Sequence, residues 1–377
     1  MSFPEVTIRD LSSRLERARS ATGAAGIDAL LVSPGPDLFY LTGYAAVPLE
    51  RLTCLLLPAA GAPLLVAPGL ERAAALASPV GELGVDVVTW DETDDPYALT
   101  ASLLPASTSV VGLDDHMWAA KVLALRAVMP EVEQALAGTV LRELRMRKTP
   151  TEIAALREAG AAIDSVHAAM GQWLRPGRTE RQVGRDISDA IVAAGHARAD
   201  FVIVAAGPNG ASPHHEVSDR VVRSGETVVV DIGGTMPSGY CSDSTRTYLT
   251  AGGPVPAEVD AYYQVLLAAQ EQQCAYARPG VTAASVDAAG RDEITAAGYG
   301  EQFVHRTGHG IGLETHEEPY VVAGNDRVLE EGMAFSIEPG IYLEGHSGAR
   351  IEDIVVCTQD GVERLNNRPR TLGLLEA

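Results

Sequence analysis

An apolar run followed by a turn places two aspartates in one predicted hairpin. The stretch VVVDIGGTMPSGYCSDSTRTY (228–248) carries Asp231 where its apolar part ends and Asp243 on the return, and the two are symmetric about Pro237. A hairpin folded about Pro237 would set their carboxylates directly opposite each other. Like charges in that position destabilise a sheet, and burial makes the repulsion stronger. A single pair of this kind is more often two acids at strand ends near a turn, so the first hairpin alone does not predict a site.

A second predicted hairpin repeats this arrangement with glutamates. In MAFSIEPGIYLEGHSGARIEDIVV (333–356), Glu338 and Glu352 are symmetric about Gly345. Four carboxylates are too negative for one ion to neutralise well, and their hard oxygen ligands do not suit a metal that prefers thiolates. They suit two divalent ions with bridging carboxylates, an arrangement that recurs in hydrolytic sites.

A nitrogen ligand would complete such a site, and five of the nine histidines fall in two short stretches. They are His305, His309 and His316 in FVHRTGHGIGLETHEEP (303–319), and His214 and His215 in SPHHEVSD (212–219). Glycines on both sides of His309 permit a close approach of the backbone that a side chain would block.

The elements that position these residues are duplicated. RPGRTERQVGRDISDAIVAAG (175–195) aligns without gaps on RPGVTAASVDAAGRDEITAAG (278–298), and 10 of the 21 positions are identical. Each copy predicts a turn, a Thr N-cap and a helix that closes on Gly. Each copy also precedes one of the two hairpins, which indicates an internal repeat.

The first part of the chain has a different character. Residues 1 to about 140 alternate short apolar runs with helical patterns, which predicts a compact α/β domain. A helical pattern then runs from 141 to 174, with a break at Thr149-Pro150 and Thr151 as the expected N-cap of its second part. We therefore expect an amino-terminal domain over 1–140 and a second domain over 141–377.

The composition excludes several classes of partner. A formal net charge of −21 disfavours nucleic acid and anionic membrane surfaces, because both are bound by clustered Lys and Arg. The most apolar window, LTCLLLPAAGAPLLVAP (52–68), is broken by prolines and a glycine, so it predicts two buried strands and no membrane span. The four cysteines are scattered and the polar amino terminus lacks a signal-peptide pattern, so a cytoplasmic location is expected.

The acidic and histidine residues together resemble a known site. The set Asp231, Asp243, His309, Glu338 and Glu352 is similar to the five-ligand dinuclear site of the pita-bread metallopeptidases, which include methionine aminopeptidase, aminopeptidase P and Xaa-Pro dipeptidase (prolidase). The phrases GYCSDSTRT, HRTGHGIGLETHEEP, FSIEPGIY and ARIEDIV carry the match. The phrase DALLVSPGPDLFYLTGY resembles the creatinase-like amino domain of the proline-specific branch.

The resemblance implies a fold class. An α/β creatinase-like amino-terminal domain is expected over 1–140. An α+β pita-bread (creatinase/aminopeptidase-like) catalytic metallopeptidase domain, with an internal pseudo-twofold duplication, is expected over 141–377. Members of the family commonly form homodimers, so a homodimer is expected here.

The resemblance also implies a role for each metal ligand. Asp231 would chelate one metal, His309 and Glu338 would bind the other, and Asp243 and Glu352 would bridge both. A hydroxide held between the metals would be the nucleophile, since two cations depress the pKa of bound water. Glu338 would also take and pass on its proton.

Five further residues have roles in the family at matching positions. His214 would hydrogen-bond the substrate near the scissile amide, and His316 would stabilise the developing oxyanion. His305, Tyr342 and Arg350 would line the pocket for the proline that follows the scissile bond. Tyr342 could instead pack in the core, and Arg350 could form an ion pair with Glu352 on the same strand face. His215 is expected to be incidental.

The spacing of the aspartates departs from the family pattern. Asp231 and Asp243 are twelve residues apart, one more than is usual. The additional residue is expected in the turn GTMPSG (234–239), where a bulge or a longer loop can absorb it. A shift of the second strand by one residue would instead point Asp243 away from the site.

The implied function is metal-dependent hydrolysis of Xaa-Pro bonds in small peptides, most closely that of an Xaa-Pro dipeptidase. The alternatives are an Xaa-Pro aminopeptidase, a hydrolase of small amides, and a non-catalytic binding protein on the same fold. Two divalent ions are expected. Oxygen-rich ligation with one histidine favours Mn²⁺, and Zn²⁺ or Co²⁺ would also fit.

Overall fold

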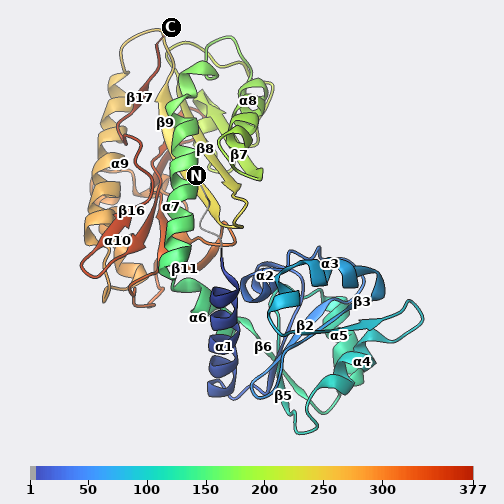
Figure 1. Ribbon diagram of the computed structural model, residues 1–377. Helices are drawn as coiled ribbons and strands as arrows, with labels where there is room; N and C mark the ends of the chain where they lie inside the picture. Colours follow the sequence, from blue (N-terminus) through green and yellow to red (C-terminus); the bar gives the residue numbers. More distant parts are fainter. Residues whose placement is uncertain (1–5, 377) are drawn as a thin grey trace. The chain divides into compact units, whose positions relative to one another are not determined.

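The computed structural model describes residues 6–376, which divide into two compact units between Arg145 and Met146 (Figure 1). The sequence places a boundary near residue 140, and helix α6 (Gly138–Met146) runs across that point. None of the helices formed by residues 6–376 is long and apolar enough to cross a membrane.

The amino-terminal unit is built on one mixed sheet with the strand order β4-β3-β2-β1-β5-β6. The strands are β1 (Ala29–Val32), β2 (Cys54–Pro58), β3 (Leu64–Pro68), β4 (Asp86–Trp90), β5 (Val110–Leu113) and β6 (Glu133–Leu136). The main helices are α1 (Ile8–Ala24), α2 (Pro36–Thr42), α3 (Arg72–Ala77), α4 (Pro96–Leu103) and α5 (Ala119–Val128). The expected α/β architecture is confirmed, and the apolar window 52–68 forms the antiparallel strands β2 and β3.

The second unit contains two larger sheets and a short two-stranded one. The first sheet has the order β17-β9-β8-β7, with β7 (Arg198–Ala206), β8 (Thr227–Thr235), β9 (Cys241–Leu249) and β17 (Gly373–Leu374). The second has the order β11-β10-β12-β15-β16, with β10 (Gly308–Gly310), β11 (Glu317–Val321), β12 (Ala334–Ile337), β15 (Asp353–Cys357) and β16 (Val362–Arg364). Strands β13 (Gly340–Leu343) and β14 (Ser347–Arg350) pair with each other. The long helices α7 (Pro150–Ala168) and α9 (Ala257–Tyr276) run alongside the strands (Figure 1).

The internal duplication is visible in helices α8 (Glu180–Ala193) and α10 (Ala283–Ala296). Both have 14 residues and begin after a Thr N-cap. The glycines that precede them, Gly177 and Gly280, have φ angles of 90° and 92°. Each of these glycines donates its N–H over 2.9 Å to the chain that leads into the following hairpin, at Val222 and Leu329 respectively. The two halves of the unit are therefore built on the same local plan.

Helix α7 begins at a different cap from the one expected. Thr149, and not Thr151, is the N-cap, and its side chain exchanges hydrogen bonds with Glu152 in a capping box. Pro150 occupies the first helical position, where its missing N–H costs nothing. The Thr-Pro break in the pattern thus marks the start of the helix itself.

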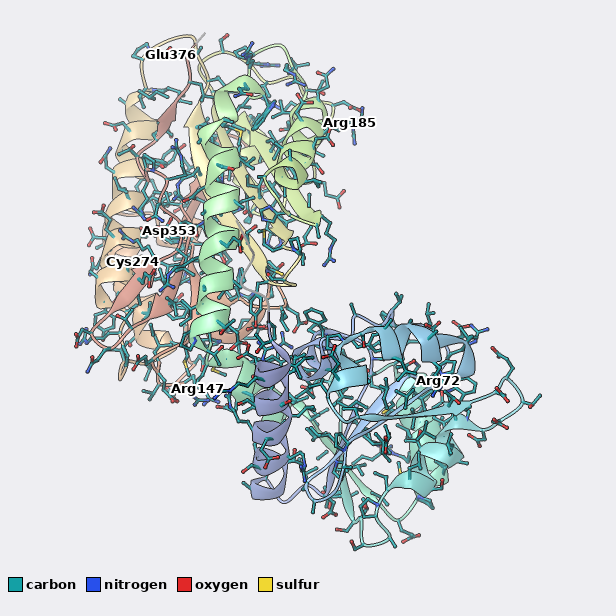
Figure 2. The ribbon with its side chains drawn as sticks, in the orientation of Figure 1. Arg72, Arg147, Arg185, Cys274, Asp353 and Glu376 are labelled. Atoms are coloured by element: carbon teal, nitrogen blue, oxygen red, sulfur yellow. The ribbon has the colours of Figure 1, made fainter. Side chains whose placement is uncertain are left out.

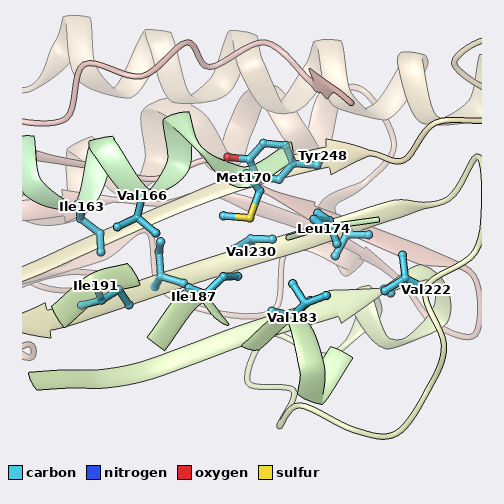
Figure 3. Close-up of a cluster of buried hydrophobic side chains, with 14 residues drawn as sticks. Ile163, Val166, Met170, Leu174, Val183, Ile187, Ile191, Val222, Val230 and Tyr248 are labelled. Carbon is cyan, nitrogen blue, oxygen red and sulfur yellow. The ribbon is translucent and has the colours of Figure 1, made fainter. Parts of the chain in front are cut away.

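A core of aliphatic side chains joins α7 and α8 to the first sheet (Figure 3). Val183, Ile187 and Ile191 of α8 recur at helical spacing and are buried against this sheet. Val230 of β8 belongs to the same core. Because side chains alternate along a strand, the neighbouring Asp231 points to the opposite face.

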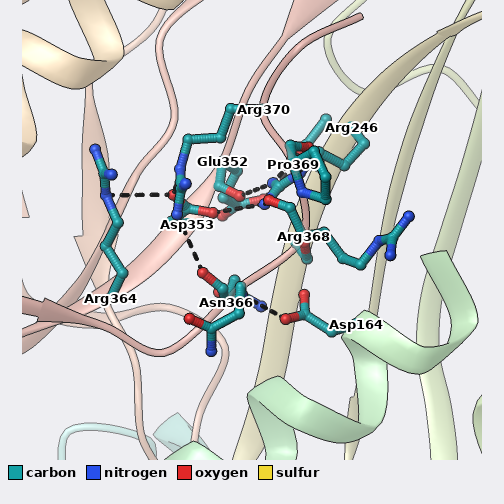
Figure 4. Close-up of polar contacts among 12 residues, drawn as sticks. Asp164, Arg246, Glu352, Asp353, Arg364, Asn366, Arg368, Pro369 and Arg370 are labelled. Carbon is teal, nitrogen blue, oxygen red and sulfur yellow. Dashed lines mark hydrogen bonds and ion pairs between the residues drawn. The ribbon is translucent and has the colours of Figure 1, made fainter. Parts of the chain in front are cut away.

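A buried ion-pair network connects the two sheets around Asp353 (Figure 4), whose place in the unit is labelled in Figure 2. Arg246 of β9 donates from Nη2 to Asp353 Oδ1 over 2.7 Å, and Gln270 of α9 donates to Oδ2 over 3.2 Å. Arg370 pairs with the same carboxylate. Arg246 also donates to the backbone carbonyl of Glu352, so the network holds the chain on which that glutamate stands.

Replacing Asp353 with Asn should destabilise this unit strongly. The change leaves Arg246 and Arg370 without their carboxylate partner in the interior, and an uncompensated buried charge costs about 3–5 kcal/mol. Urea unfolding followed by circular dichroism measures the loss. The exposed Asp360→Asn is the control and should unfold like the wild type. An Asp353→Asn protein as stable as this control would contradict the role given to the network.

Candidate active site

The first aspartate pair lies diagonally across strands β8 and β9. Asp231 pairs with Thr245, and Asp243 pairs with Gly233, two residues farther along β8. The prediction of a hairpin about Pro237, with the carboxylates directly opposite, was therefore wrong by one residue. The two aspartates still share a face, because side chains two residues apart on a strand point the same way.

The turn between these strands explains the offset. It comprises five residues and closes with a hydrogen bond of 2.9 Å from the N–H of Met236 to the carbonyl of Tyr240. The strand pairing on either side is unbroken over nine residues. The turn thus holds five residues without a bulge in the flanking strands, and Asp243 keeps its orientation toward the site.

The second hairpin folds as predicted. Both of its ladders, β12–β15 and β13–β14, are centred on Gly345, which has a φ angle of 75°. Glu338 and Glu352 lie in the gap between the two ladders, where the strand pairing is interrupted. The N–H of Glu352 instead donates to the carbonyl of Thr245 in the first hairpin, over 3.1 Å. This bond joins the two halves beside the carboxylates.

His309 is held with one ring nitrogen toward the acids. Its Nδ1 lies 3.1 Å from the carbonyl of Gly310, which can only accept, so Nδ1 carries the proton and Nε2 is free to bind a cation. The positions on either side of His309 have no room for a side chain, so both must be glycine. A Cβ on Gly308 would lie 1.9 Å from the carbonyl of Ser336, and one on Gly310 would lie 2.1 Å from that of Glu318.

A single cavity of about 750 Å³ gathers nearly all the candidates. Its lining includes Asp231, Asp243, His309, Glu338 and Glu352, together with His214, His305, His316 and Arg350. Tyr342 is not among the lining residues and lies buried behind Arg350 and His305.

The four acids of the cavity carry more negative charge than its two arginines, Arg306 and Arg350, can offset. Asp243, His309 and Glu352 offer ligand atoms within 4.8 Å of one another. Burial, and then repulsion from the neighbouring carboxylates, raises the pKa values of Asp243 and Glu352 well above their usual range. Buried oxygens of Asp231 (Oδ1) and Glu352 (Oε1) have no hydrogen-bond partner among the described residues. This donor set, rich in oxygen with one imidazole, fits divalent metal ions.

The other two acids have local partners. His309 Nε2 lies 3.2 Å from Glu338 Oε1, and the hydroxyl of Ser336 donates to the same oxygen over 3.0 Å. Burial opposes ionisation of Glu338, but His309 and the nearby cationic groups lower its pKa to about 2. Asp231 accepts from Arg350 Nη2 at 2.7 Å.

Arg350 begins a directed chain of hydrogen bonds. It pairs with Asp231 of the other hairpin and not with its strand neighbour Glu352. Its Nη1 donates to the hydroxyl of Tyr342 over 2.8 Å, and that hydroxyl lies 2.7 Å from His305 Nε2. Burial raises the pKa of Tyr342 to about 12 and lowers that of His305, so the hydroxyl is the donor to a neutral imidazole. Tyr342 therefore influences the cavity only by positioning Arg350 and His305.

Two more histidines, His316 and His214, line the cavity. The ring of His316 lies 4.0 Å from that of His309, centroid to centroid. Burial, and then the neighbouring His309 and Arg306, lower the pKa of His316 to about 4. His214 is exposed at the cavity wall, in the loop between β7 and β8.

That loop is anchored by a residue that the sequence did not single out. Glu180, fully buried at the start of α8, accepts from the N–H of Ala206 at 2.9 Å, from Asn209 Nδ2 at 2.9 Å and from the N–H of Ser218 at 3.1 Å. His215 Nε2, expected to be incidental, donates to it over 2.8 Å. Burial alone would raise the pKa of Glu180, but these hydrogen bonds, led by that from the Ser218 side chain, lower it. The carboxylate thus fixes both ends of the segment that carries His214.

The sequence also missed part of the cavity wall. Phe201 and Ile203 of β7 line the cavity, and Ile203 pairs directly with Asp231. Their i, i+2 spacing in DFVIV was the available signal, because the two side chains share a face of the strand. Arg306, between His305 and the GHG segment, also lines the cavity.

Comparison with known proteins agrees with this geometry. Residues 154–359 match the model of metallopeptidase family M24, and residues 14–147 match the creatinase/prolidase N-terminal domain. A probable dipeptidase PepE of Mycobacterium bovis is 55% identical over 359 residues, 95% of each chain. An Xaa-Pro dipeptidase of Lactobacillus helveticus is 38% identical over 92% of this chain and 95% of its own.

A solved structure shows the same architecture. The crystal structure of dipeptidase PepE from Mycobacterium ulcerans superposes with a TM-score of 0.94 and 51% identity, over 98% of this chain and 99% of that one. The expected fold class, an α/β amino-terminal domain and a duplicated pita-bread domain, is confirmed. The chain belongs to metallopeptidase family M24 and is a metallopeptidase that works with divalent metal ions.

Proposed function

We propose that this protein is an Xaa-Pro dipeptidase that acts with two divalent metal ions, natively Mn²⁺. The proposal is carried by the convergence of four acidic side chains and His309 Nε2 on one cavity, with buried carboxylate oxygens that lack partners among the described residues. The names of the relatives, a dipeptidase and an Xaa-Pro dipeptidase, support the choice of substrate.

The metal ions would be held by five residues of the chain. They are Asp231, Asp243, His309, Glu338 and Glu352, and Asp243 and Glu352 would be shared by both ions. When bound, two such ions supply Lewis acidity toward the scissile carbonyl and a water acidic enough to give hydroxide near neutral pH.

The remaining steps belong to side chains. Glu338, whose pKa is lowered by its contact with His309, can accept a proton from the attacking water and pass it to the leaving proline nitrogen. His316, with its pKa lowered to about 4, is neutral and can donate a hydrogen bond to the developing oxyanion. His214 can hydrogen-bond the substrate from the facing wall.

The cavity wall suits a proline ring. Phe201, Ile203 and Pro213 present apolar surface, and His305 and Arg350 lie among the other lining residues. A peptide bond before proline lacks an N–H, so its recognition depends on shape and apolar contact more than on a backbone hydrogen bond. We assign His305 and Arg350 to this pocket, and Tyr342 a supporting position behind them.

We also propose that the protein works in the cytoplasm as a homodimer. Its four cysteines are all buried free thiols, which suits a reducing compartment. The homodimer follows from the resemblance to the family.

The test of this function is a side-by-side assay of the Mn²⁺-loaded protein on Ala-Pro and Ala-Pro-Ala-Ala. We expect cleavage of Ala-Pro, loss of activity with EDTA, and recovery when Mn²⁺ is restored. Cleavage of the longer peptide would identify an Xaa-Pro aminopeptidase instead. Failure on both peptides with metal bound would refute the proposal and favour a small-amide hydrolase.

Removing a shared ligand should remove both metal and activity. In Asp243→Ala or Glu352→Ala, the remaining donors cannot hold two ions, so we expect less than half the wild-type metal content and no measurable turnover. Elemental analysis and the Ala-Pro assay measure the two effects. Glu344→Ala, an exposed acid in the turn of the second hairpin, is the control. Full metal occupancy in either site variant would contradict the dinuclear assignment.

Loosening the His214 loop should impair turnover without removing metal. Glu180→Gln turns one accepting oxygen into an amide that faces N–H donors, and such a mismatch costs enough to lower kcat by about 10-fold. Steady-state kinetics and metal content together check this. Glu216→Gln, an exposed change in the same loop, should behave as wild type. An unchanged kcat in Glu180→Gln would show that the loop does not need this anchor.

A further inference from the structure

We propose that Arg306 binds the carboxylate of the substrate's C-terminal residue and thereby restricts the enzyme to dipeptides. This inference rests on the proposed peptidase function and names the residue that would separate a dipeptide from a longer chain. In a dipeptide, the residue after the scissile bond ends in an anionic carboxylate. In a longer peptide the same position holds an uncharged amide.

The guanidinium of Arg306 is free to take an anion. It lines the cavity and is only partly buried. Its Cζ lies 4.4 Å from the ring centroid of Tyr320, so an aromatic face supports it from one side. Within residues 6–376 it makes no hydrogen bond or ion pair, which leaves all five N–H donors available.

The other arginine of the cavity is already occupied. Arg350 donates from Nε to Thr245 Oγ1 at 3.1 Å, and from Nη1 to the Tyr342 hydroxyl at 2.8 Å and to the Pro213 carbonyl at 3.3 Å. From Nη2 it donates to Asp231 Oδ2 at 2.7 Å. One N–H of five remains, so Arg350 cannot offer the paired donors that bind a carboxylate most strongly.

The position of Arg306 is fixed through its backbone. His305 Nδ1 donates to the carbonyl of Arg306 over 2.7 Å. The imidazole of His305 is itself held by Tyr342, whose hydroxyl is held by Arg350. The chain of hydrogen bonds that starts at Asp231 therefore ends at the peptide group of Arg306.

The charges of the cavity also favour a cationic residue at the place where a substrate carboxylate binds. The positive charges of two divalent ions and Arg350 would only slightly exceed the negative charges of the four carboxylates that line it. A substrate carboxylate then gains a net favourable partner from Arg306, whose charge already acts on the neighbouring His316. Charge-assisted hydrogen bonds of this kind change affinity by about 10- to 100-fold.

The experiment compares Ala-Pro with its amide, Ala-Pro-NH2, on the Mn²⁺-loaded full-length enzyme. The two substrates differ only in the charge at the end that Arg306 is proposed to bind. We expect the wild type to prefer the acid by about 10- to 100-fold in kcat/KM. In Arg306→Gln the KM for Ala-Pro should rise by that factor while the kinetics on the amide stay within about 2-fold, so the preference disappears. Arg306→Lys, which keeps the charge, should recover part of it.

A matched control separates this effect from the loss of an arginine elsewhere. Arg278 lies over the ring of Tyr276 at 5.3 Å, outside the cavity, so Arg278→Gln removes a similar cation–π pair. It should keep the wild-type preference for the acid. Metal content and circular dichroism of Arg306→Gln should match the wild type, because its guanidinium bonds no described residue.

Three results would overturn the inference. They are a wild type without preference for the acid, an Arg306→Gln enzyme that retains the preference, and a variant that loses both substrates equally. If the wild type cleaves Ala-Ala but not Ala-Pro, the proline specificity fails, and the acid–amide comparison is then made on Ala-Ala. If no peptide is cleaved, the proposed function fails. Isothermal titration calorimetry then compares the affinity of the protein for Ala-Pro with that for its amide, which tests the role of Arg306. Equal affinities there would also overturn the role of Arg306.

Discussion

The mutual repulsion of four carboxylates inside one cavity is the constraint around which the catalytic unit is arranged. Asp231, Asp243, Glu338 and Glu352 share a space in which Arg350 already uses four of its five N–H donors and His309 is neutral when it binds a metal. Bound cations would offset this repulsion, which otherwise favours protonation of Asp243 and Glu352. The glycines beside His309, the diagonal hairpin and the ion-pair network behind Glu352 all serve to keep these charges close together.

The duplicated architecture provides the acids in pairs, yet the two halves use them differently. Helices α8 and α10 start and end in the same way, and each is tied to its own hairpin. The first hairpin keeps continuous strands and sets its aspartates on a diagonal, whereas the second interrupts its ladders where its glutamates stand. The second half supplies Arg350, and Asp231 of the first half accepts its hydrogen bond.

The sequence predicted the parts that local patterns encode. The duplication, the α/β amino-terminal unit and the symmetry about Gly345 follow from repeats, periodicity and turn residues. The register of the first hairpin does not follow from such patterns. A five-residue turn can close in several ways, and the pairing of the whole strands decides that it closes with the hydrogen bond between Met236 and Tyr240. The partner of Arg350 depends on how two hairpins pack, and Glu180 looked like an ordinary acid in the first turn of a helix. Neither carries a local signal.

The hydrogen bonds that join the two halves of the site also determine at which stage of folding the site forms. The contact between Arg350 and Asp231 spans 119 residues of chain, and that between Thr245 and Glu352 spans 107. Contacts so distant in sequence form late in folding, after the entropy of closing long loops has been overcome. A chain still being synthesised would therefore offer metals only scattered single ligands. The complete set of ligands comes together only once both hairpins have formed and packed against each other.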